Sequence, residues 1–524
     1  MSAAGQPLGQ AGVRLAEVVA ALSLATDLGT GHPIERSLRS CLLAVHFADE
    51  LGVGDDERRE IYYVALLRWV GCTADESRSA IFGDEIALGP EIDRVQLWNP
   101  TAMLGALWRL VEADQPPLRR AGAVAHGMLT GIQRSRESVA AHCEVAQRIA
   151  DRLGFGDGIL AALGQIFERW DGKGVPGAAR GEGIARSARI VQIAMDAELF
   201  ARLGGEQAVL GVLRERSGNT YDPALAARFA GAVPRLLPLL DEPSAWDRAI
   251  AAEPGERARL TEGQLDTALE AIGDFADLRA PTTVGHSPSV AALVEEGARR
   301  FGLPQADVDA ARRAGLIHDV GMTGIPMKLH QKPGPLTDLE WERLRLHTYY
   351  TERILARPRE LGRFGALAAL HHERLDGSGY HRGLPAAMLP PAARLIAAAD
   401  AYRAMIEPRP YRPAFAPEAA AEELGRDVRA GRLDGDAVRA ILEAAGHRVR
   451  PRRREQVAGL TEREIEVLRL VARGYTKRQV GEALSISERT ADHHIRHIYT
   501  KLGVSTRAAA TLFAMQHHLV GDAD

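Results

Sequence analysis

LIHDVG, at residues 316–321, is the stretch that decides the fold of this 524-residue chain. It places a histidine and an aspartate side by side, His318 and Asp319, at the end of an apolar run. Neutral imidazoles and carboxylates are ligands for pairs of hard or borderline divalent metals such as Fe, Mn, Co or Zn. Two such metals about 3.5–4 Å apart can together activate water toward a phosphorus atom. The stretch therefore points first to metal-dependent phosphate chemistry.

Further metal-capable side chains flank this pair on both sides. They are His286, His347, His371, His372 and Asp400. Thr337 followed by Glu340 predicts a capping box that opens a helix. On that helix His347 shares one face with apolar residues at steps of three and four, so it is expected to point toward the core. His371 and His372 end a short apolar run just before a breaker-rich stretch at 376–379. The pattern predicts a metal held between several helices, with a polar loop beside it.

The spacing and the surrounding letters resemble the HD-GYP branch of the HD phosphohydrolase superfamily. The matching stretches are GHS at 285–287, LIHDVG at 316–321, IPMKLHQKPGPLTDLEWERLRLH at 325–347, HHERLDGSGY at 371–380, ARLIAAADAY at 393–402 and EPRPYRP at 407–413. The resemblance implies two divalent metal ions, Fe, Mn or similar, with Asp319 bridging them and His318 beside it in the catalytic centre. The other five residues named above would complete the metal shells. It also implies a phosphodiester substrate, with cyclic dinucleotides such as cyclic di-GMP as the best-known class.

The chain departs from that family in three places. Met322 stands where a lysine usually neutralises substrate phosphate, and a thioether offers no charge. His381 replaces the proline of GYP, and Thr282 stands where some members have a glutamate for a third metal, which favours two metals here. Loss of a phosphate-pairing cation costs roughly several kcal/mol of transition-state stabilisation unless another cation replaces it. The residues expected at the substrate are Lys328, Lys332, Asp376, Gly377, Gly379, Tyr380 and Arg382.

An internal repeat precedes this region. Residues 142–196 align without gaps onto 347–401, and YYVALLRWVG at 62–71 matches ARRAGLIHDVG at 311–321. The first copy replaces the metal-type residues with Arg68, Trp69, Ile166, Phe167 and Met195, while His142 stays in register with His347. Either His32 or Arg36 occupies the first ligand position. The first copy is therefore expected to be metal-free. Packing against the second copy, dimerisation, ligand sensing and a purely structural role stay open for it. A further alternative is a partial exchange of function, in which Arg68 or Lys173 binds a phosphate.

The C-terminal stretch at 460–510 resembles the LuxR-type helix-turn-helix module along its whole length. Four short helices are expected, with Thr461, Thr476 and Ser487 opening the first three. The third helix would enter the major groove with its N-terminal half on base edges. By position, base-reading residues would be Asp492, His493 and Arg496, and residues at or near phosphates would be Arg478, Arg489, Thr490 and Lys501. Asp492 stands where the family often has lysine, so a different base preference is expected, such as cytosine N4.

Charge and composition fit this organisation. Residues 448–524 carry a net charge of +5 and the whole chain −4, so an acidic body bears a basic tail. Hydrophobic residues make up 46% of the chain, and strand-like alternation is scarce, which predicts a nearly all-helical protein. Neither a membrane span nor a signal peptide is predicted, and the three cysteines form no disulfide or metal pattern, which favours the cytoplasm.

The predicted fold class is all-α, with tandem helical HD domains followed by a four-helix LuxR-type module. The expected domains are a degenerate HD-like domain at 1–205, a connecting helical segment at 206–275, an HD-GYP-type domain at 276–447, a basic linker at 448–459 and the helix-turn-helix domain at 460–524. Two functions remain open: a metal-dependent phosphohydrolase that controls transcription, and a regulator that senses metal and nucleotide without turnover. DNA and a phosphate-containing nucleotide are the expected partners, and a homodimer is expected because one module reads one half-site.

Overall fold

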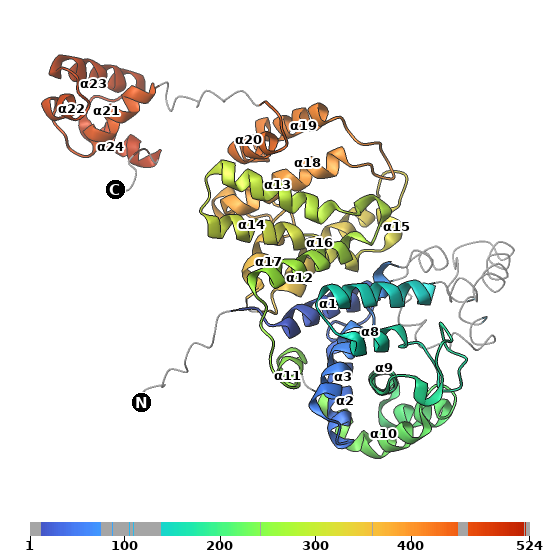
Figure 1. Ribbon diagram of the computed structural model, residues 1–524. Helices are drawn as coiled ribbons and strands as arrows, with labels where there is room; N and C mark the ends of the chain where they lie inside the picture. Colours follow the sequence, from blue (N-terminus) through green and yellow to red (C-terminus); the bar gives the residue numbers. More distant parts are fainter. Residues whose placement is uncertain are drawn as a thin grey trace, which may run out of the picture. The chain divides into compact units, whose positions relative to one another are not determined.

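A computed structural model describes residues 12–74, 138–241, 243–358, 360–448 and 460–517, together with the single positions 86, 104, 108 and 519. Within these ranges the chain forms helices and isolated bridges and no strand, so the all-α prediction is confirmed there. The chain divides into two compact units, Met1–His447 and Arg448–Asp524 (Figure 1). None of the described helices is long and apolar enough to span a bilayer. The predicted basic linker lies almost entirely outside the described residues.

The first copy of the repeat is a helical bundle. Its elements are α1 (Leu15–Gly29), α2 (Arg36–Glu50), α3 (Asp55–Leu67), η1 (Val70–Ala74), a helix over 138–152, α8 (Asp157–Gly164), η2 (Gly181–Gly183) and α9 (Arg186–Arg216). They are followed by α10 (Pro223–Leu236), η3 (Leu237–Leu240) and α11 (Trp246–Ala251). Helix α2 packs on α3 and α9, and α10 packs on α9. Gly204 and Gly205 interrupt the helical backbone of α9.

The second copy repeats the arrangement. Its elements are α12 (Glu262–Asp277), η4 (Pro281–Thr283), α13 (His286–Phe301), α14 (Gln305–Ile317), η5 (Val320–Gly324), α15 (Met327–His330), α16 (Asp338–Leu355), α17 (Gly362–Ala368), η6 (Ala386–Met388), α18 (Pro391–Ile406), α19 (Pro417–Arg429) and α20 (Gly435–Ala444). Helix α13 packs on α14, α18 and α20, and α16 packs on η5 and α17. In Figure 1 the green to orange helices of this copy lie together.

Local sequence sets where these helices begin. The predicted capping box of Thr337 and Glu340 opens α16, with the Thr337 hydroxyl accepting the Glu340 N–H and the Glu340 side chain accepting the Thr337 N–H at 2.7 Å. Thr261 and Gln264 form the same motif at α12. Each box satisfies backbone donors that a helix start leaves open. His347 lies on α16 with 1% of its surface exposed, as its helical face predicted.

The repeat seen in sequence is also a repeat of side-chain contacts. Asp27 accepts the Ser37 hydroxyl at 2.6 Å in the first copy, and Asp277 accepts the Ser287 hydroxyl at 2.7 Å in the second. These pairs put Arg36, and not His32, at the position of His286. The equivalent buried carboxylates Glu168 and Glu373 each accept backbone N–H groups of the following loop. The two copies therefore share a scaffold that does not depend on the metal-type residues.

The two copies contact each other through equivalent elements. Helix α1 of the first copy packs on η5 of the second, and α12 of the second packs on η1 of the first. The Thr323 hydroxyl in η5 donates to the Ala25 carbonyl in α1 at 3.1 Å. Helix α12 thus occupies in the second copy the position that α1 occupies in the first. Most of α12 lies within residues 206–275, which were predicted from the sequence to be a connecting segment.

The C-terminal unit has the four helices expected from its pattern. They are α21 (Glu462–Ala472), α22 (Lys477–Ala483), α23 (Glu488–Leu502) and α24 (Arg507–Gln516). The side chains of Thr461, Thr476 and Ser487 accept N–H groups at the starts of α21, α22 and α23. Leu468, Val471, Val480 and Ile498 form its core with other apolar residues of the four helices. The unit is therefore folded around a core to which all four helices contribute.

Candidate functional site

Five separate elements of the second copy bring the metal-type side chains together. His286 is the first residue of α13, His318 and Asp319 lie at the junction of α14 and η5, and His347 lies on α16. His371 and His372 follow α17, and Asp400 lies on α18. These helices pack directly on one another, so residues separated by more than a hundred positions meet in one place.

Hydrogen bonds to backbone carbonyls orient three of the imidazoles. Nδ1 of His318 lies 2.8 Å from the carbonyl of Gly315, Nδ1 of His347 lies 2.7 Å from that of Leu344, and Nδ1 of His371 lies 2.6 Å from that of Ala368. A carbonyl can only accept, so each Nδ1 carries the proton. In the neutral ring the lone pair is then on Nε2, the atom that faces the carboxylates.

Asp319 reaches two groups of histidines with its two oxygens. Its Oδ1 lies 3.4 Å from Nε2 of His371 and 3.7 Å from Nε2 of His347. Its Oδ2 lies 3.5 Å from Nε2 of His318. One carboxylate thus stands between both groups, which is the position that a bridging ligand requires.

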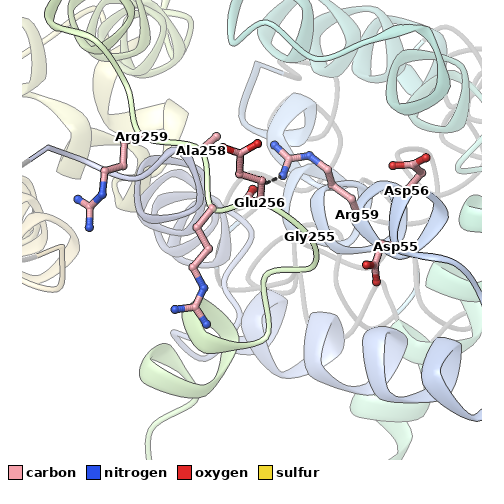
Figure 2. Close-up of a pocket in the computed structure, with 8 residues that line it drawn as sticks. Asp55, Asp56, Arg59, Gly255, Glu256, Ala258 and Arg259 are labelled. Atoms are coloured by element: carbon pink, nitrogen blue, oxygen red, sulfur yellow. Dashed lines mark hydrogen bonds between the residues drawn. The ribbon is translucent and has the colours of Figure 1, made fainter. Parts of the chain in front are cut away.

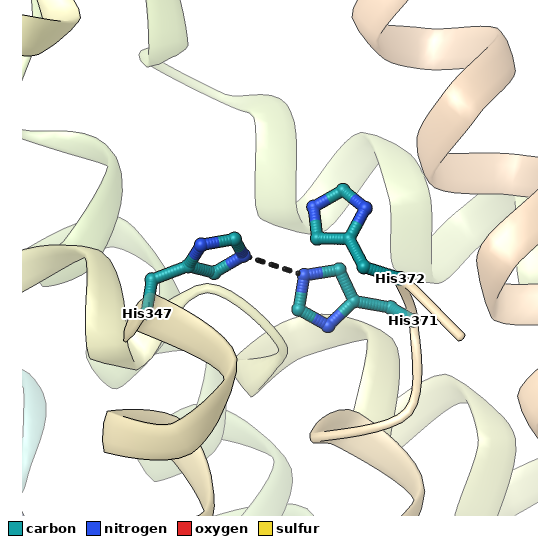
Figure 3. Close-up of side chains that lie close together, drawn as sticks. All are labelled: His347, His371 and His372. Carbon is teal, nitrogen blue, oxygen red and sulfur yellow. Dashed lines mark hydrogen bonds between the residues drawn. The ribbon is translucent and has the colours of Figure 1, made fainter. Parts of the chain in front are cut away.

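Potential ligand atoms gather in three overlapping sets. Each set has its atoms within 4.8 Å of one another: His347 with His371 and His372, His286 with His318 and Asp400, and His318 with Asp319 and His371. Figure 3 shows the first set, with His347 and His371 facing each other and His372 beside them. Asp400 Oδ1 lies 3.2 Å from Nε2 of His286, and its Oδ2 lies 4.0 Å from Nδ1 of His372. All seven residues predicted from the sequence as metal ligands are therefore neighbours.

Burial and mutual charge shift the pKa values in this cluster. Burial lowers the pKa of His347 to about 4, and it also lowers that of His318. Burial acts against the charged form of His371 too, but its hydrogen bond to Asp319 prevails and raises its pKa. Burial opposes ionisation of Asp319, yet the neighbouring imidazoles, His318 first, hold the pKa of Asp319 well below its usual value. Burial also acts against the charged form of His286, but its hydrogen bonds to Asp400 and Glu407 raise the pKa of His286 to about 10. The cluster thus places neutral imidazoles, His318 and His347 among them, and two imidazoles of raised pKa around ionised carboxylates.

This donor set fits divalent cations. Nε2 of His318 is buried and has no hydrogen-bond partner. Nε2 of His347 and Nε2 of His371 lie 3.1 Å apart, although the Nδ1 of each ring is already committed to a carbonyl. Two neutral rings would point lone pairs at each other there, so a proton or a cation must lie between them. Metal ligands require deprotonated side chains, which burial supplies for most of these imidazoles.

The breaker-rich loop forms a wall beside the cluster. The Tyr380 ring stacks on His372 with centroids 4.7 Å apart. Asp376 Oδ1 accepts the Ser378 N–H at 3.0 Å, and Gly377 has a φ of 77°, so these residues shape the turn. A Cβ at Gly379 would overlap the backbone of Glu373. Of the predicted substrate residues in this loop, Tyr380 is the one in contact with the histidines.

The cations predicted to face the substrate are mostly engaged elsewhere. Lys332 pairs with Glu340 at 2.5 Å, and Arg382 pairs with Glu352. Lys328 is an exposed residue of α15. His381 contacts α16 through Thr348 and Glu352, at 3.1 and 2.9 Å, rather than the histidine cluster.

Three side chains near the cluster were missed in the sequence. The guanidinium of Arg345 lies 5.5 Å from the Tyr380 ring, and Glu407 accepts Nδ1–H of His286 at 2.8 Å. Glu373 is 2% exposed and anchors the loop through the N–H groups of Arg382 and Leu384. The signals were present but weak: Arg345 lies two residues before His347, and Glu407 lies two helical turns after Asp400.

The first copy holds cations where the second has histidines. Arg36 and Arg68 stack against Trp69 at 5.6 and 4.9 Å, and Nε of Arg36 lies 3.4 Å from Glu198. Phe167 packs edge-on to Trp69 at 5.8 Å. Of the described residues, those that form metal-type sets all belong to the second copy. A polar hollow between α3, with Asp55 and Arg59, and the segment before α12, with Glu256, contains no such set (Figure 2).

The C-terminal unit presents a polar helix face. On α23, Arg489, Thr490, His493 and Arg496 are exposed, and Arg478 on α22 is exposed as well. Asp492 pairs with Arg496 at 2.5 Å and with Lys477. Lys501 instead pairs at 2.6 Å with Glu464 in the capping box of α21, so it fastens α23 to α21.

Comparison with known proteins agrees with this geometry. Residues 270–437 match the HD domain family, and residues 458–514 match the luxR family of bacterial regulatory proteins. A 3'3'-cGAMP-specific phosphodiesterase of Vibrio cholerae is 27% identical over 406 residues, covering 76% of this chain and 88% of that protein. A cyclic di-GMP phosphodiesterase of Thermotoga maritima is 38% identical over 146 residues, covering 28% of this chain and 40% of that protein.

A solved structure extends the likeness to most of the fold. The crystal structure of a cyclic GMP-AMP specific phosphodiesterase of V. cholerae superposes with a TM-score of 0.59 and 25% identity, covering 83% of this chain and 98% of that one. The match is too long to involve the second copy alone. The chain therefore has an HD domain of the HD-GYP-like type, homologous over most of its length to cyclic dinucleotide phosphodiesterases, and a C-terminal LuxR-type helix-turn-helix domain.

Proposed function

We propose that this protein is a DNA-binding transcriptional regulator whose second HD copy is a metal-dependent phosphodiesterase acting on a cyclic dinucleotide. The observation that carries the proposal is Asp319, whose two oxygens each face a different group of imidazoles. One metal would be held by His286, His318 and Asp400, and the other by His347, His371 and His372. Two divalent ions held there would act as Lewis acids toward a phosphodiester and would make water a better nucleophile.

The chain's own residues would orient the substrate. Tyr380 offers an aromatic face at the edge of the cluster, suited to stacking by a nucleobase. Arg345 lies next to it with 48% of its side chain exposed, and its carboxylate partner Glu342 is 72% exposed. A surface pair of this kind is weak, so Arg345 is available to a phosphate. We assign to Arg345 the phosphate-pairing role for which Met322 has no charge.

A second candidate function is a metal- and nucleotide-sensing regulator without turnover. Met322 favours it, because this apolar residue follows Asp319 closely on η5 and contributes no cation. Either function leaves the C-terminal unit as the DNA-binding part, with Asp492, His493 and Arg496 reading bases and Arg478, Arg489 and Thr490 near phosphates. A dimer is proposed because one unit of this size covers one half-site.

One experiment separates the two candidates. Purified protein is analysed for bound metal and assayed for hydrolysis of 3'3'-cGAMP and cyclic di-GMP, with His318→Ala and Met322→Lys as variants. Metal and turnover in the wild type, both lost in His318→Ala, support the enzyme. Metal without turnover, with activity gained by Met322→Lys, supports the sensor. Absence of metal from the wild type contradicts both.

DNA recognition is tested separately by binding to selected operator fragments. Arg496→Ala should lower specific affinity while leaving the thermal unfolding of the C-terminal unit unchanged, because Arg496 is exposed on α23. A base contact is worth roughly 1–3 kcal/mol. Undiminished specific binding by Arg496→Ala would contradict the assignment of this helix face to the groove.

A further inference from the structure

We infer that Glu407 is a positioning residue for His286, and that it makes the group of His286, His318 and Asp400 hold its divalent ion more tightly than the group of His347, His371 and His372. The inference rests on the proposed function, because it concerns how that same site is loaded.

His286 lacks the backbone partner that three other histidines share. His318, His347 and His371 each donate Nδ1–H to the carbonyl three residues earlier in a helical turn. His286 is the first residue of α13, so no turn of that helix precedes it. Its Nδ1 instead donates to Oε2 of Glu407 at 2.8 Å, while its Nε2 faces Asp400 at 3.2 Å. Glu407 thus does for His286 what a carbonyl does for the others.

Glu407 is itself held in place. It follows the last residue of α18, seven positions after Asp400, so both carboxylates lie on one face of the helix. The guanidinium of Arg403 lies 3.1 Å from it and that of Arg409 lies 3.2 Å from it. Its side chain is 14% exposed. The His286 ring is therefore oriented by a fixed group and not by a mobile surface carboxylate.

A carboxylate partner has a different effect on the ring from that of a carbonyl. Its full negative charge makes the opposite nitrogen a stronger electron donor, and loss of such a partner typically costs about 10–100-fold in metal affinity. In the other group, His347 and His371 have neutral carbonyls as partners. The two groups should therefore load unequally, with the group of His286 filled first.

The first copy provides an internal comparison. By the repeat, Arg36 corresponds to His286, and Arg202 corresponds to Glu407. Arg202 pairs with Glu198 at 2.6 Å, and Glu198 also faces Arg36. The carboxylate at the position of Glu407 is thus absent where the imidazole is absent. This agrees with a role for Glu407 toward His286 rather than toward the shared scaffold.

Manganese titration of the full chain tests the inference. Bound Mn²⁺ is counted calorimetrically and by electron paramagnetic resonance, which distinguishes a single ion from a coupled pair. The wild type should load in two steps. With His347→Ala, or His372→Ala if that protein does not fold, only the group of His286 is complete, and adding Glu407→Gln should weaken Mn²⁺ binding about 10–100-fold. Glu407→Leu should weaken it further, because leucine also removes the acceptor.

Two controls make the outcome specific. In a His286→Ala background, Glu407→Gln should leave Mn²⁺ affinity unchanged, since the ring it positions is gone. Glu418→Gln removes an exposed carboxylate from the next helix and should change neither step. Equal weakening of both steps by Glu407→Gln, or no weakening, overturns the inference while leaving the proposed function intact. A wild type that binds no Mn²⁺ and no other divalent metal overturns both.

Discussion

A short hydrogen bond to the backbone, repeated three times, orients the imidazoles of the metal-type cluster. Each of His318, His347 and His371 donates Nδ1–H to a carbonyl three residues earlier. The contact fixes the tautomer and the ring plane, so the lone pairs converge on Asp319 without the entropic cost of ordering free side chains. At the scale of single residues, the arrangement of the cluster depends on hydrogen bonds to the backbone as much as on which residue types are present.

Arg345 yields a prediction about substrate affinity. Replacing it with alanine should lower kcat/KM for a cyclic dinucleotide by about tenfold or more, because a hydrogen bond to a charged group is worth roughly 1.5–3 kcal/mol. Arg345→Lys should retain part of the wild-type kcat/KM, because lysine keeps the positive charge. Glu342→Gln removes only the exposed partner of Arg345 and should leave kcat/KM unchanged. Steady-state kinetics of the wild type and the three variants measures these values of kcat/KM. Equal kcat/KM for Arg345→Ala and wild type would remove Arg345 from the substrate site.

Asp27 yields a prediction about pH. Burial within α1 raises the pKa of Asp27 to about 7, although the Ser37 hydroxyl opposes the rise. The folded protein then keeps a proton that the unfolded chain has released, so stability falls as pH rises from about 4 to 7. Asp27→Asn removes that dependence and should be more stable than the wild type at pH 8 by about 2–4 kcal/mol, with little difference near pH 4. Urea unfolding at both pH values measures this. A constant difference across the range would contradict the assignment.

The sequence predicted which metal-type side chains gather in the cluster better than it predicted the residues that contact them. His286, His347 and Asp400 could be named because each sits in a recognisable stretch at a fixed spacing. Glu407 and Arg345 could not, because their roles depend on which atom of a neighbour they reach after folding. Lys332 and Arg382 were predicted as substrate cations from charge and position alone, and their pairing with Glu340 and Glu352 is visible only in three dimensions.

At the level of elements, η5 is where the two copies and the cluster meet. It follows Asp319 in the chain and packs both on α16 and on α1 of the first copy. Its Gly321 lies against the backbone of α16, where a Cβ would overlap the carbonyl oxygen of His347. The N–H of Gly321 donates to the Thr351 hydroxyl at 3.0 Å, and that hydroxyl donates to the His318 carbonyl at 2.9 Å. The close approach of these two elements is what sets the distance between His318 and His347.

Gly321→Ala should therefore damage stability and metal loading together. The added methyl must push η5 away from α16, and overpacking of this kind costs about 1–3 kcal/mol. Divalent metal affinity should fall as well, because His347 moves relative to Asp319. Gly334→Ala is the matched control, since a Cβ there meets nothing within 4 Å. Thermal unfolding and metal content are the readouts. A Gly321→Ala protein with normal stability would contradict the close approach.

Element boundaries followed from local chemistry, whereas the assignment of α12 did not. The capping boxes at Thr337 and Thr461 were predicted because a helix start needs side-chain acceptors for its free N–H groups. Helix α12 was predicted as helical but assigned to a connection, because a helix pattern does not say which core it joins. The repeated Asp–Ser contact of α1 and α12 supplies that information.

At the scale of the whole molecule, one chain joins a cyclic-dinucleotide phosphodiesterase homologue to a DNA-binding unit. The first copy packs through α1 on η5, the element that follows Asp319 in the second copy. The C-terminal unit has its own core and its own capping boxes. The net charge of +5 at 448–524, against −9 for the rest, would direct DNA to that unit.

The proposed regulator makes a reciprocal prediction about its two ligands. If nucleotide binding at the HD site changes operator affinity by a given factor, operator DNA must change nucleotide affinity by the same factor, typically about 5–150-fold. Both affinities should be measured with a non-hydrolysable phosphorothioate analogue in the presence of divalent metal, with and without saturating partner. His318→Ala should lose the effect of nucleotide on DNA while keeping its DNA affinity, because His318 lies in the HD cluster. An operator affinity that is unchanged by saturating analogue would mean that the two units act separately, and that joining them in one chain does not place transcription under the control of the nucleotide.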